Sequence, residues 1–198
     1  MAFASYDELM ADVAKYLKRQ DLTAIIPDFV MFAESYFDKN IYVNARRTSF
    51  VSTPTANVFS TPSDMKKAIQ AYYLGRILDF FPLGFESTYA GGDGNVIAHG
   101  WQLMGNQITL SVPQLGQIFQ LDYYTILEGL SSTNESNWLL EDAPEVYLAG
   151  VLHEAFSYVR DEERAGYWLQ KRDAAIQSYI DDDTAKRSPA AQLTIRAG

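Results

Sequence analysis

The sequence predicts an α+β fold: a bundle of N- and C-terminal helices with an inserted antiparallel β-meander subdomain and an extended C-terminal tail. Three observations lead to this prediction. Residues 1–40 and 137–183 repeat apolar side chains at helical spacing, whereas residues 41–136 change to a period of two with turn residues between the runs. Residues 184–198 are basic and contain Pro189, which favours an extended tail. The chain has 198 residues and 47% hydrophobic content, enough for a real core.

The C-terminal helix pair, residues 137–183, gives the clearest signal. Asp142 is the expected N-cap of its first helix, with Glu145 as capping-box partner and Pro144 in the first turn, where proline is tolerated. Asp161 is the expected N-cap of the second helix. The corner at residues 158–161 leaves almost no loop, so the two helices should be neighbours. Their apolar stripes are expected to include Val146, Tyr147, Gly150, Leu152, His153, Phe156, Ala165, Trp168, Ile176 and Tyr179.

Residues 1–40 are expected to form a helical hairpin. Ser5 and Glu8 have the spacing of a capping box, which predicts a helix ending near Arg19. Pro27 then lies near the start of a second helix, where its missing N–H matters least. This second helix should end near Asn40.

Short strands are expected throughout residues 41–136, at 46–52, 57–60, 77–81, 96–103, 107–111 and 117–127, with the last three forming the meander. Residues 65–74 fit both a strand and a helix, because their apolar residues also match a spacing of 3.6. We favour the strand, with Gly75 and Arg76 as its hairpin turn. Residues 82–90 are expected to form a short helix. The glycine-rich residues 91–94 lack the strand and helix that flank a phosphate loop, so we expect a surface loop.

Composition excludes several classes of function. The chain has no cysteine, which removes disulfides, thiol catalysis and thiolate metal sites. No apolar run reaches membrane-spanning length, and the acidic N-terminal segment does not read as a signal peptide, so no membrane association is expected. The formal net charge of −9 argues against binding nucleic acid through its phosphates as the main activity.

Candidate catalytic and metal-ligating residues are few. His153 lies on an apolar helix face and is expected to be a hydrogen-bonded core residue, and His99 lies in a predicted strand. Glu154 with Asp161, or Glu162 with Glu163, have the residue types of an acid/base pair, but capping and dipole effects already explain acids at a helix start. The acidic run 181–183 is expected to be a solvated helix end rather than a cation site. We therefore expect no enzymatic activity, no cofactor and no metal.

An ordered set of features resembles a known family. The C-terminal half contains Trp138-Leu139-Leu140, an acidic turn with Pro144, an Ala/Gly-rich helix, and Asp161-Glu162-Glu163-Arg164 before a second helix and an arginine-bearing tail. The N-terminal pattern DLTAIIPDFVMFAESYFDKNI adds to it. This order is similar to the head-to-tail adaptor (connector) proteins of short-tailed bacteriophages, over nearly the whole chain.

The resemblance implies a structural virion protein, made in the host cytoplasm and located in the neck of the virion. By it, about twelve copies form a ring beneath the portal protein, extend the DNA channel and anchor tail nozzle or tail-fibre proteins. DNA would pass through the lumen without sequence-specific binding, and an acidic wall would let it slide. The tail, through Lys186, Arg187, Leu193, Ile195 and Arg196, would dock on the portal. Trp138, Asp142, Asp161 and Trp168 would hold the helix pair together.

Two other classes of function stay open at this point. A soluble carbohydrate- or peptide-binding module would expose a cluster of aromatic side chains near Trp101, Tyr123 and Tyr124. A cell-wall hydrolase would depend on Glu154 or Asp161.

Overall fold

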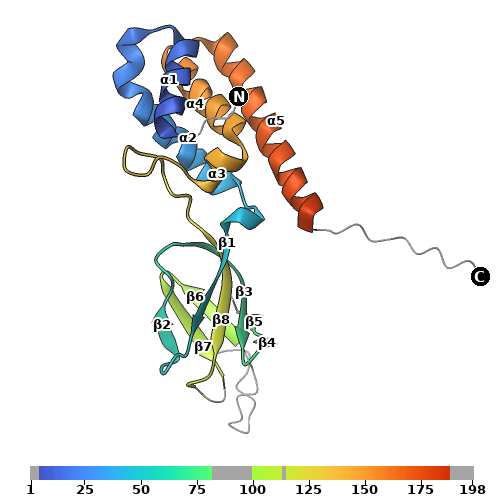
Figure 1. The fold of residues 1–198 in the computed structure, drawn as a ribbon. Helices are drawn as coiled ribbons and strands as arrows, with labels where there is room; N and C mark the ends of the chain where they lie inside the picture. Colours follow the sequence, from blue (N-terminus) through green and yellow to red (C-terminus); the bar gives the residue numbers. More distant parts are fainter. Residues whose placement is uncertain (1–4, 82–99, 113–114, 188–198) are drawn as a thin grey trace, which may run out of the picture. The chain divides into compact units, whose positions relative to one another are not determined.

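The computed structural model describes residues 5–81, 100–112 and 115–187. The chain divides into two compact units, a helical unit of residues 1–45 and 127–198 and a β unit of residues 46–126 (Figure 1). The predicted α+β class is confirmed, with helices in both terminal parts and strands in the middle. The predicted helix at 82–90, the loop at 91–94 and the first part of the strand at 96–103 lie outside the described residues.

The helical unit begins with two helices joined by a short 3₁₀ segment. Helix α1 (Tyr6–Leu17) has Ser5 as its N-cap, whose Oγ accepts a hydrogen bond from the backbone N–H of Glu8 at 3.4 Å. Segment η1 (Gln20–Ile25) leads into α2 (Ile26–Asn40), which has its proline in the first turn. The two helices predicted for residues 1–40 are therefore present, and a 3₁₀ helix joins them.

The rest of the helical unit consists of α3 (Trp138–Asp142), α4 (Pro144–Tyr158) and α5 (Glu162–Arg187). Helix α4 is buried on most sides, and the core of this unit includes the almost fully buried Leu9, Val13, Ile26, Phe37, Leu139, Val146, Tyr147, Val151 and Leu152. Gly150 lets α4 approach α2 closely, because a Cβ atom there would lie 2.4 Å from Cζ of Phe37. The close approach explains why a glycine stands in the middle of this helix despite its poor helix propensity.

The β unit is a sandwich of two four-stranded sheets. One sheet has the order β1 (Arg47–Ser52), β8 (Phe119–Thr125), β3 (Met65–Tyr73), β4 (Arg76–Ile77). The other has the order β2 (Val58–Ser60), β7 (Gln107–Ser111), β6 (Gly100–Met104), β5 (Asp79–Phe80). Side chains from both sheets make its core: Ala71, Tyr73, Leu78, Trp101, Ile108, Leu110, Phe119, Leu121 and Tyr123.

Residues 65–73 are a strand, as favoured, because β3 pairs along its length with β8. Three details predicted for the β segment are wrong. β8 lies between β1 and β3 instead of continuing the β6–β7 hairpin, and the expected strand at 77–81 is split at buried Leu78 into β4 and β5, which belong to different sheets. The hairpin turn is Leu74-Gly75, both with positive φ, one residue earlier than expected.

Candidate interaction site

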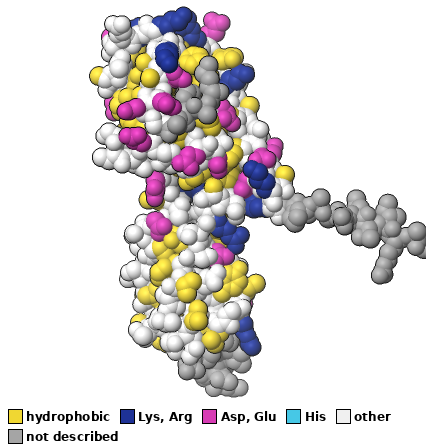
Figure 2. All heavy atoms as spheres, viewed as in Figure 1, with side chains coloured by type: hydrophobic (Ala, Val, Ile, Leu, Met, Phe, Trp, Pro, Cys, Tyr) yellow, Lys and Arg dark blue, Asp and Glu magenta, His cyan; other side chains and the backbone are white. Residues whose placement is uncertain are grey.

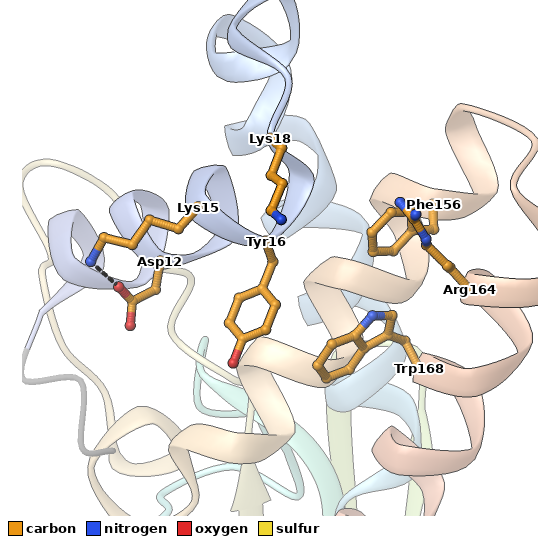
Figure 3. A pocket seen from close by; sticks show the side chains of 7 residues that line it. All are labelled: Asp12, Lys15, Tyr16, Lys18, Phe156, Arg164 and Trp168. Carbon is orange, nitrogen blue, oxygen red and sulfur yellow. Dashed lines mark hydrogen bonds and ion pairs between the residues drawn. The ribbon is translucent and has the colours of Figure 1, made fainter.

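A groove opens on the helical unit between α1 and α5. Its volume is about 700 Å³, and it is lined by Asp12, Lys15, Tyr16, Lys18, Phe156, Arg164 and Trp168 (Figure 3). Tyr16 from α1 and Trp168 from α5 meet edge to face, with ring centroids 5.5 Å apart. Phe156 contributes a buried aromatic ring from α4. We refer to this set of seven residues as the α1–α5 groove.

The α1–α5 groove carries more positive than negative charge. Lys15 is paired with Asp12 on the same helix. Lys18 follows the end of α1 in the left-handed conformation, and its side chain is one of those that line the groove (Figure 3). The Arg164 guanidinium lies 5.4 Å from the centre of the Phe156 ring, and its Nε is 3.4 Å from Asp161. The groove thus combines aromatic walls with cationic groups, a chemistry suited to an apolar group that carries a nearby acid.

Helix α2 presents a second exposed surface. Asp28, Met31, Phe32, Ser35 and Lys39 share one face at helical spacing, and all five are exposed, Met31 at 56% and Phe32 at 53%. The opposite face of α2 is buried in the core through Phe29, Val30, Ala33 and Phe37. We call the exposed set the α2 outer face. Two adjacent large apolar side chains on the solvent side of a helix are typical of a contact surface.

A buried polar network fixes α2 against the segment that returns from the β unit. Oε1 of Glu34 accepts hydrogen bonds from the backbone N–H of Leu130 at 2.7 Å and from the hydroxyl of Tyr147 at 3.0 Å. That hydroxyl in turn accepts a hydrogen bond from Nδ2 of Asn137 at 2.7 Å. Burial raises the pKa of Glu34, against hydrogen bonds from Leu130 and Tyr147 that lower it, and burial also raises the pKa of Tyr147.

Asp142 does not cap the first helix of the C-terminal pair. It is the last residue of α3, and α4 begins at Pro144 with Ala143 at the N-cap position and no side-chain cap. Asn137 caps α3 instead, because its Oδ1 accepts a hydrogen bond from the backbone N–H of Leu140 at 3.0 Å. The predicted N-cap role of Asp142 is therefore wrong. Its Oδ2 instead accepts a hydrogen bond from the hydroxyl of Tyr179 at 2.9 Å, and the Tyr179 ring stacks on Trp138 with centroids 6.3 Å apart. These contacts tie α5 to α3.

The corner between α4 and α5 agrees with its prediction. Oδ1 of Asp161 accepts a hydrogen bond from the backbone N–H of Arg164 at 3.1 Å, as expected of an N-cap. Arg160 has a φ of 58° and turns the chain between the helices. Nδ1 of His153 lies 3.0 Å from the carbonyl oxygen of Ala165, so this histidine is hydrogen-bonded across the corner, as predicted.

Glu162 and Glu163 are exposed in the first turn of α5, where the helix dipole favours them. Within residues 5–81, 100–112 and 115–187, no group of three or more histidine, aspartate or glutamate side chains is placed to hold a metal ion. His99 lies outside the described residues.

The aromatic cluster expected of a carbohydrate- or peptide-binding module is not exposed. Trp101 is 3% exposed and Tyr123 is 5% exposed, because both point into the core between the two sheets. The hydroxyl of Tyr123 donates to Asp64 at 2.9 Å, and burial, with this hydrogen bond, raises its pKa to about 12. Tyr124, the next residue along β8, points to the other face of the sheet and is partly exposed. Trp101 and Tyr123 are therefore accounted for as core residues of the sandwich.

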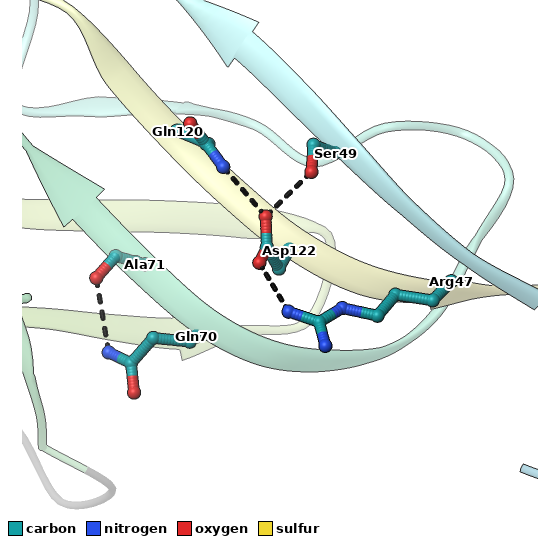
Figure 4. A network of polar contacts seen from close by, with 6 residues as sticks. All are labelled: Arg47, Ser49, Gln70, Ala71, Gln120 and Asp122. Atoms are coloured by element: carbon teal, nitrogen blue, oxygen red, sulfur yellow. Dashed lines mark hydrogen bonds and ion pairs between the residues drawn. The ribbon is translucent and has the colours of Figure 1, made fainter. Parts of the chain in front are cut away.

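Asp122 organises a polar network on β8 that the sequence did not reveal (Figure 4). Its carboxylate accepts hydrogen bonds from Ser49 at 2.6 Å, Gln120 at 2.9 Å and Arg47 at 2.7 Å. Burial acts to raise the pKa of Asp122, but these hydrogen bonds outweigh it and the pKa is lowered. Because Ser49 and Arg47 belong to β1, the network joins two neighbouring strands.

The start of the predicted tail is helical. Helix α5 continues to Arg187, and Lys186 and Arg187 pair with Asp182 and Asp183 one turn earlier, each at 2.7 Å. The expectation that the extended segment begins at residue 184 is therefore wrong by one helical turn. Leu193, Ile195 and Arg196 lie outside the described residues.

Charge is distributed unequally between the two units. Residues 46–126 contain five acidic and five basic residues, so the whole net charge of −9 belongs to the residues of the helical unit. On the face shown in Figure 2, acidic side chains are scattered over the helical unit, whereas the β unit shows mainly hydrophobic and uncharged side chains. Exposed apolar residues of the β unit include Val51, Leu74, Ile77, Met104 and Ile118.

The fold and these surfaces define a class before any comparison: an α+β protein whose helical unit is interrupted by a β-sandwich and whose distinguishing surfaces are suited to protein contacts. The sequence profile of the SU10 adaptor protein family matches residues 4–195. The chain therefore belongs to this family of phage head-to-tail adaptor proteins, which are structural components of the virion. A search of curated proteins found no match. No helix in the described part of the chain is long and apolar enough to cross a membrane.

Proposed function

We propose that this protein is the ring-forming head-to-tail adaptor of its phage. About twelve copies assemble beneath the portal, extend the DNA channel and present a platform for tail nozzle or tail-fibre proteins. The family match over residues 4–195 is the observation that carries this proposal. The protein acts by assembly, without turnover. Repeated contacts between two different surfaces of the same chain close a ring when the rotation per subunit is right.

The charge of the helical unit supports a role beside DNA. The residues of this unit hold all of the net negative charge, while those of the β unit are balanced. We propose that the helical unit faces the channel, where an acidic wall repels DNA phosphates and lets the genome slide. Tight gripping would instead require clustered lysine and arginine side chains, and acids outnumber bases in this unit.

The assembly test is size-exclusion chromatography with light scattering, on the adaptor alone and mixed with the portal of its own phage. The proposal predicts that the mixture gives a ring-sized complex containing both proteins. The adaptor alone can remain a 22.3 kDa monomer, because the portal serves as template. If the adaptor never migrates with the portal at any mixing ratio, the proposed function is wrong.

We also propose that the C-terminal segment docks on the portal. Lys186 and Arg187 are held within α5 by their acidic partners, so the docking contacts are assigned mainly to Leu193, Ile195 and Arg196. A truncation after Arg187 tests this role and leaves every described contact in place. A truncation after Asp183 is less suitable, because it removes the last turn of α5 and the ion pair that Arg187 makes with Asp183, whose Oδ1 accepts a hydrogen bond from Asn44.

A further inference from the structure

We infer that, in the assembled ring, the α2 outer face of one copy enters the α1–α5 groove of the next copy. This inference rests on the proposed ring and names the two surfaces that join neighbouring subunits. The occupant of the groove is a second copy of this chain, with Met31 and Phe32 filling the aromatic part and Asp28 facing the cations. Four observations support the assignment.

The first observation is that the fold does not need Met31 and Phe32. Helix α2 already buries Phe29, Val30, Ala33 and Phe37 in the core of the helical unit. Met31 and Phe32 lie on the other side of the helix and are more than half exposed. Polar residues at these two positions would suit the isolated subunit equally well. Leaving two large apolar side chains in water forfeits free energy that burial would provide, and a subunit contact would recover much of it.

The second observation is the size and chemistry of the groove. A volume of about 700 Å³ is ample for two large side chains, and Tyr16, Phe156 and Trp168 supply aromatic walls. Phenylalanine packs edge to face on such rings, and the methionine thioether makes favourable contacts with ring edges.

The third observation is charge complementarity. Asp28 lies three and four residues before Met31 and Phe32, on the same face of α2. Within the groove, Lys18 and Arg164 are exposed, and the contact of Arg164 with Asp161 is a long one, at 3.4 Å. An acid beside an apolar pair therefore meets cations beside an aromatic pocket. The one cation of the α2 outer face, Lys39, lies about three helical turns from Asp28 and so is well separated from this contact.

The fourth observation is that the two surfaces share no residue. The groove is built from α1, α4 and α5, and the outer face is built from α2 alone. Each copy therefore offers both halves of the contact, which is the requirement for a head-to-tail arrangement around an axis. A two-fold contact made by the groove alone is disfavoured, because it would bring two basic surfaces together.

The natural absence of cysteine gives a direct test, because every thiol in a variant is an introduced one. Met31→Cys is placed on the α2 outer face and Lys18→Cys on the rim of the groove, and each variant is assembled on portal and treated with a short bismaleimide. The double variant should give a ladder of covalent multimers, and an equal mixture of the two single variants should give mainly dimers. Gln177→Cys, exposed on α5 outside the groove, replaces Lys18→Cys as the matched control and should give neither.

Charge reversal provides a second test, which measures assembly on portal and does not depend on the efficiency of cross-linking. Asp28→Arg and Arg164→Glu should each reduce assembly on portal by roughly tenfold or more, because each places like charges across the contact. The two changes together should restore assembly. Both side chains are exposed, so helical content measured by circular dichroism should stay at the wild-type value.

The outcomes separate this inference from the proposed function. If wild-type protein does not assemble on portal, the proposed function itself fails. If wild-type protein assembles but the multimer ladder matches the Gln177→Cys control, or the reversed pair does not recover, the assigned surfaces are wrong while the ring stands. Cross-links from Lys18→Cys to the portal chain would give the groove a different occupant and overturn the inference.

Discussion

Substitution by alanine should change the free energy of unfolding in opposite directions at two glycines that lie in helix interiors. Gly150 lies in the middle of α4 and packs on α2, whereas Gly166 lies in α5, where a Cβ atom would meet nothing within 4 Å. Alanine favours a helix over glycine by about 1 kcal/mol at both sites. The difference between the two variants therefore isolates the contact between α4 and α2.

The magnitude follows from the space at each site. At Gly150, a Cβ atom would lie 2.4 Å from Cζ and 3.0 Å from Cε1 of Phe37. The Phe37 ring would have to move by about 1 Å to reach ordinary contact. This ring is fully buried and packs against Tyr147 at a centroid distance of 5.3 Å, so the cost should be near the upper end of the roughly 1–3 kcal/mol typical of overpacking. Gly150→Ala should thus destabilise by about 1–2 kcal/mol, and Gly166→Ala should stabilise by up to about 1 kcal/mol.

The assay is urea unfolding of the isolated protein, followed by far-ultraviolet circular dichroism, which reports chiefly on the helical unit. The slope of the transition is compared between variants, so that a change in midpoint can be read as a change in free energy. The free energies of unfolding of the two variants should differ by about 1–3 kcal/mol. Equal stabilisation by both substitutions would refute the close packing of α4 on α2.

Three further predictions concern buried charges. Burial raises the pKa of Glu34 in the folded protein. The stability of wild type relative to Glu34→Gln should therefore fall as the pH rises from about 4.3, the value for an unfolded glutamate, through the raised pKa. A series of urea midpoints in which this relative stability rises with pH would contradict the prediction. The pKa of Asp122 is lowered, so its effect on stability has the opposite pH dependence. Asp122→Asn should lower the free energy of unfolding by roughly 1–3 kcal/mol at pH 7, and this loss should shrink as the pH falls below about 3.9. A loss that stays constant with pH would argue against the network in Figure 4. Arg172 is buried, with its guanidinium 3.8 Å from the centre of the Tyr36 ring, so Arg172→Leu should lower the free energy of unfolding by about 1–2 kcal/mol. Lys171 lies at an exposed position over Tyr167, so Lys171→Leu should lower it by less than about 0.5 kcal/mol. Thermal unfolding that ranks the two variants the other way would be inconsistent with the stacking of Arg172 on Tyr36.

Much of the helical unit could be predicted because its signals are local. Ser5 caps α1 and Asp161 caps α5 through side chains that reach only three residues along the chain. The first C-terminal helix shows the limit of this reasoning. Asp142 has the chemistry of a cap, but it ends the short helix α3, and α4 begins without a side-chain cap. Its carboxylate is engaged by Tyr179, 37 positions along the chain, a partner that no local pattern indicates.

The β unit was less predictable because sheet membership depends on distant pairing. Residues 65–73 fit two periods, and their pairing with β8 decides in favour of a strand. Trp101 and Tyr123 resemble binding-site aromatics until the second sheet covers them. At the end of α5, the pairs of Lys186 with Asp182 and of Arg187 with Asp183 extend the helix beyond the acidic run where it was expected to stop.

The interaction surfaces were also beyond the sequence. Met31 and Phe32 are apolar residue types that usually lie inside a protein, and the structure shows that they face solvent, on the side of α2 away from its buried face. The α1–α5 groove combines residues about 150 positions apart, from Tyr16 to Trp168. No spacing rule connects them.

We propose that this chain forms a closed ring on the portal, and native mass spectrometry of the purified complex can count the copies. The mass added to the portal should be about 270 kDa, corresponding to twelve copies of the 22.3 kDa chain, and no partially loaded species should dominate once the adaptor is in excess. A distribution that centres on one or two copies per portal, whatever the excess of adaptor, would contradict the ring.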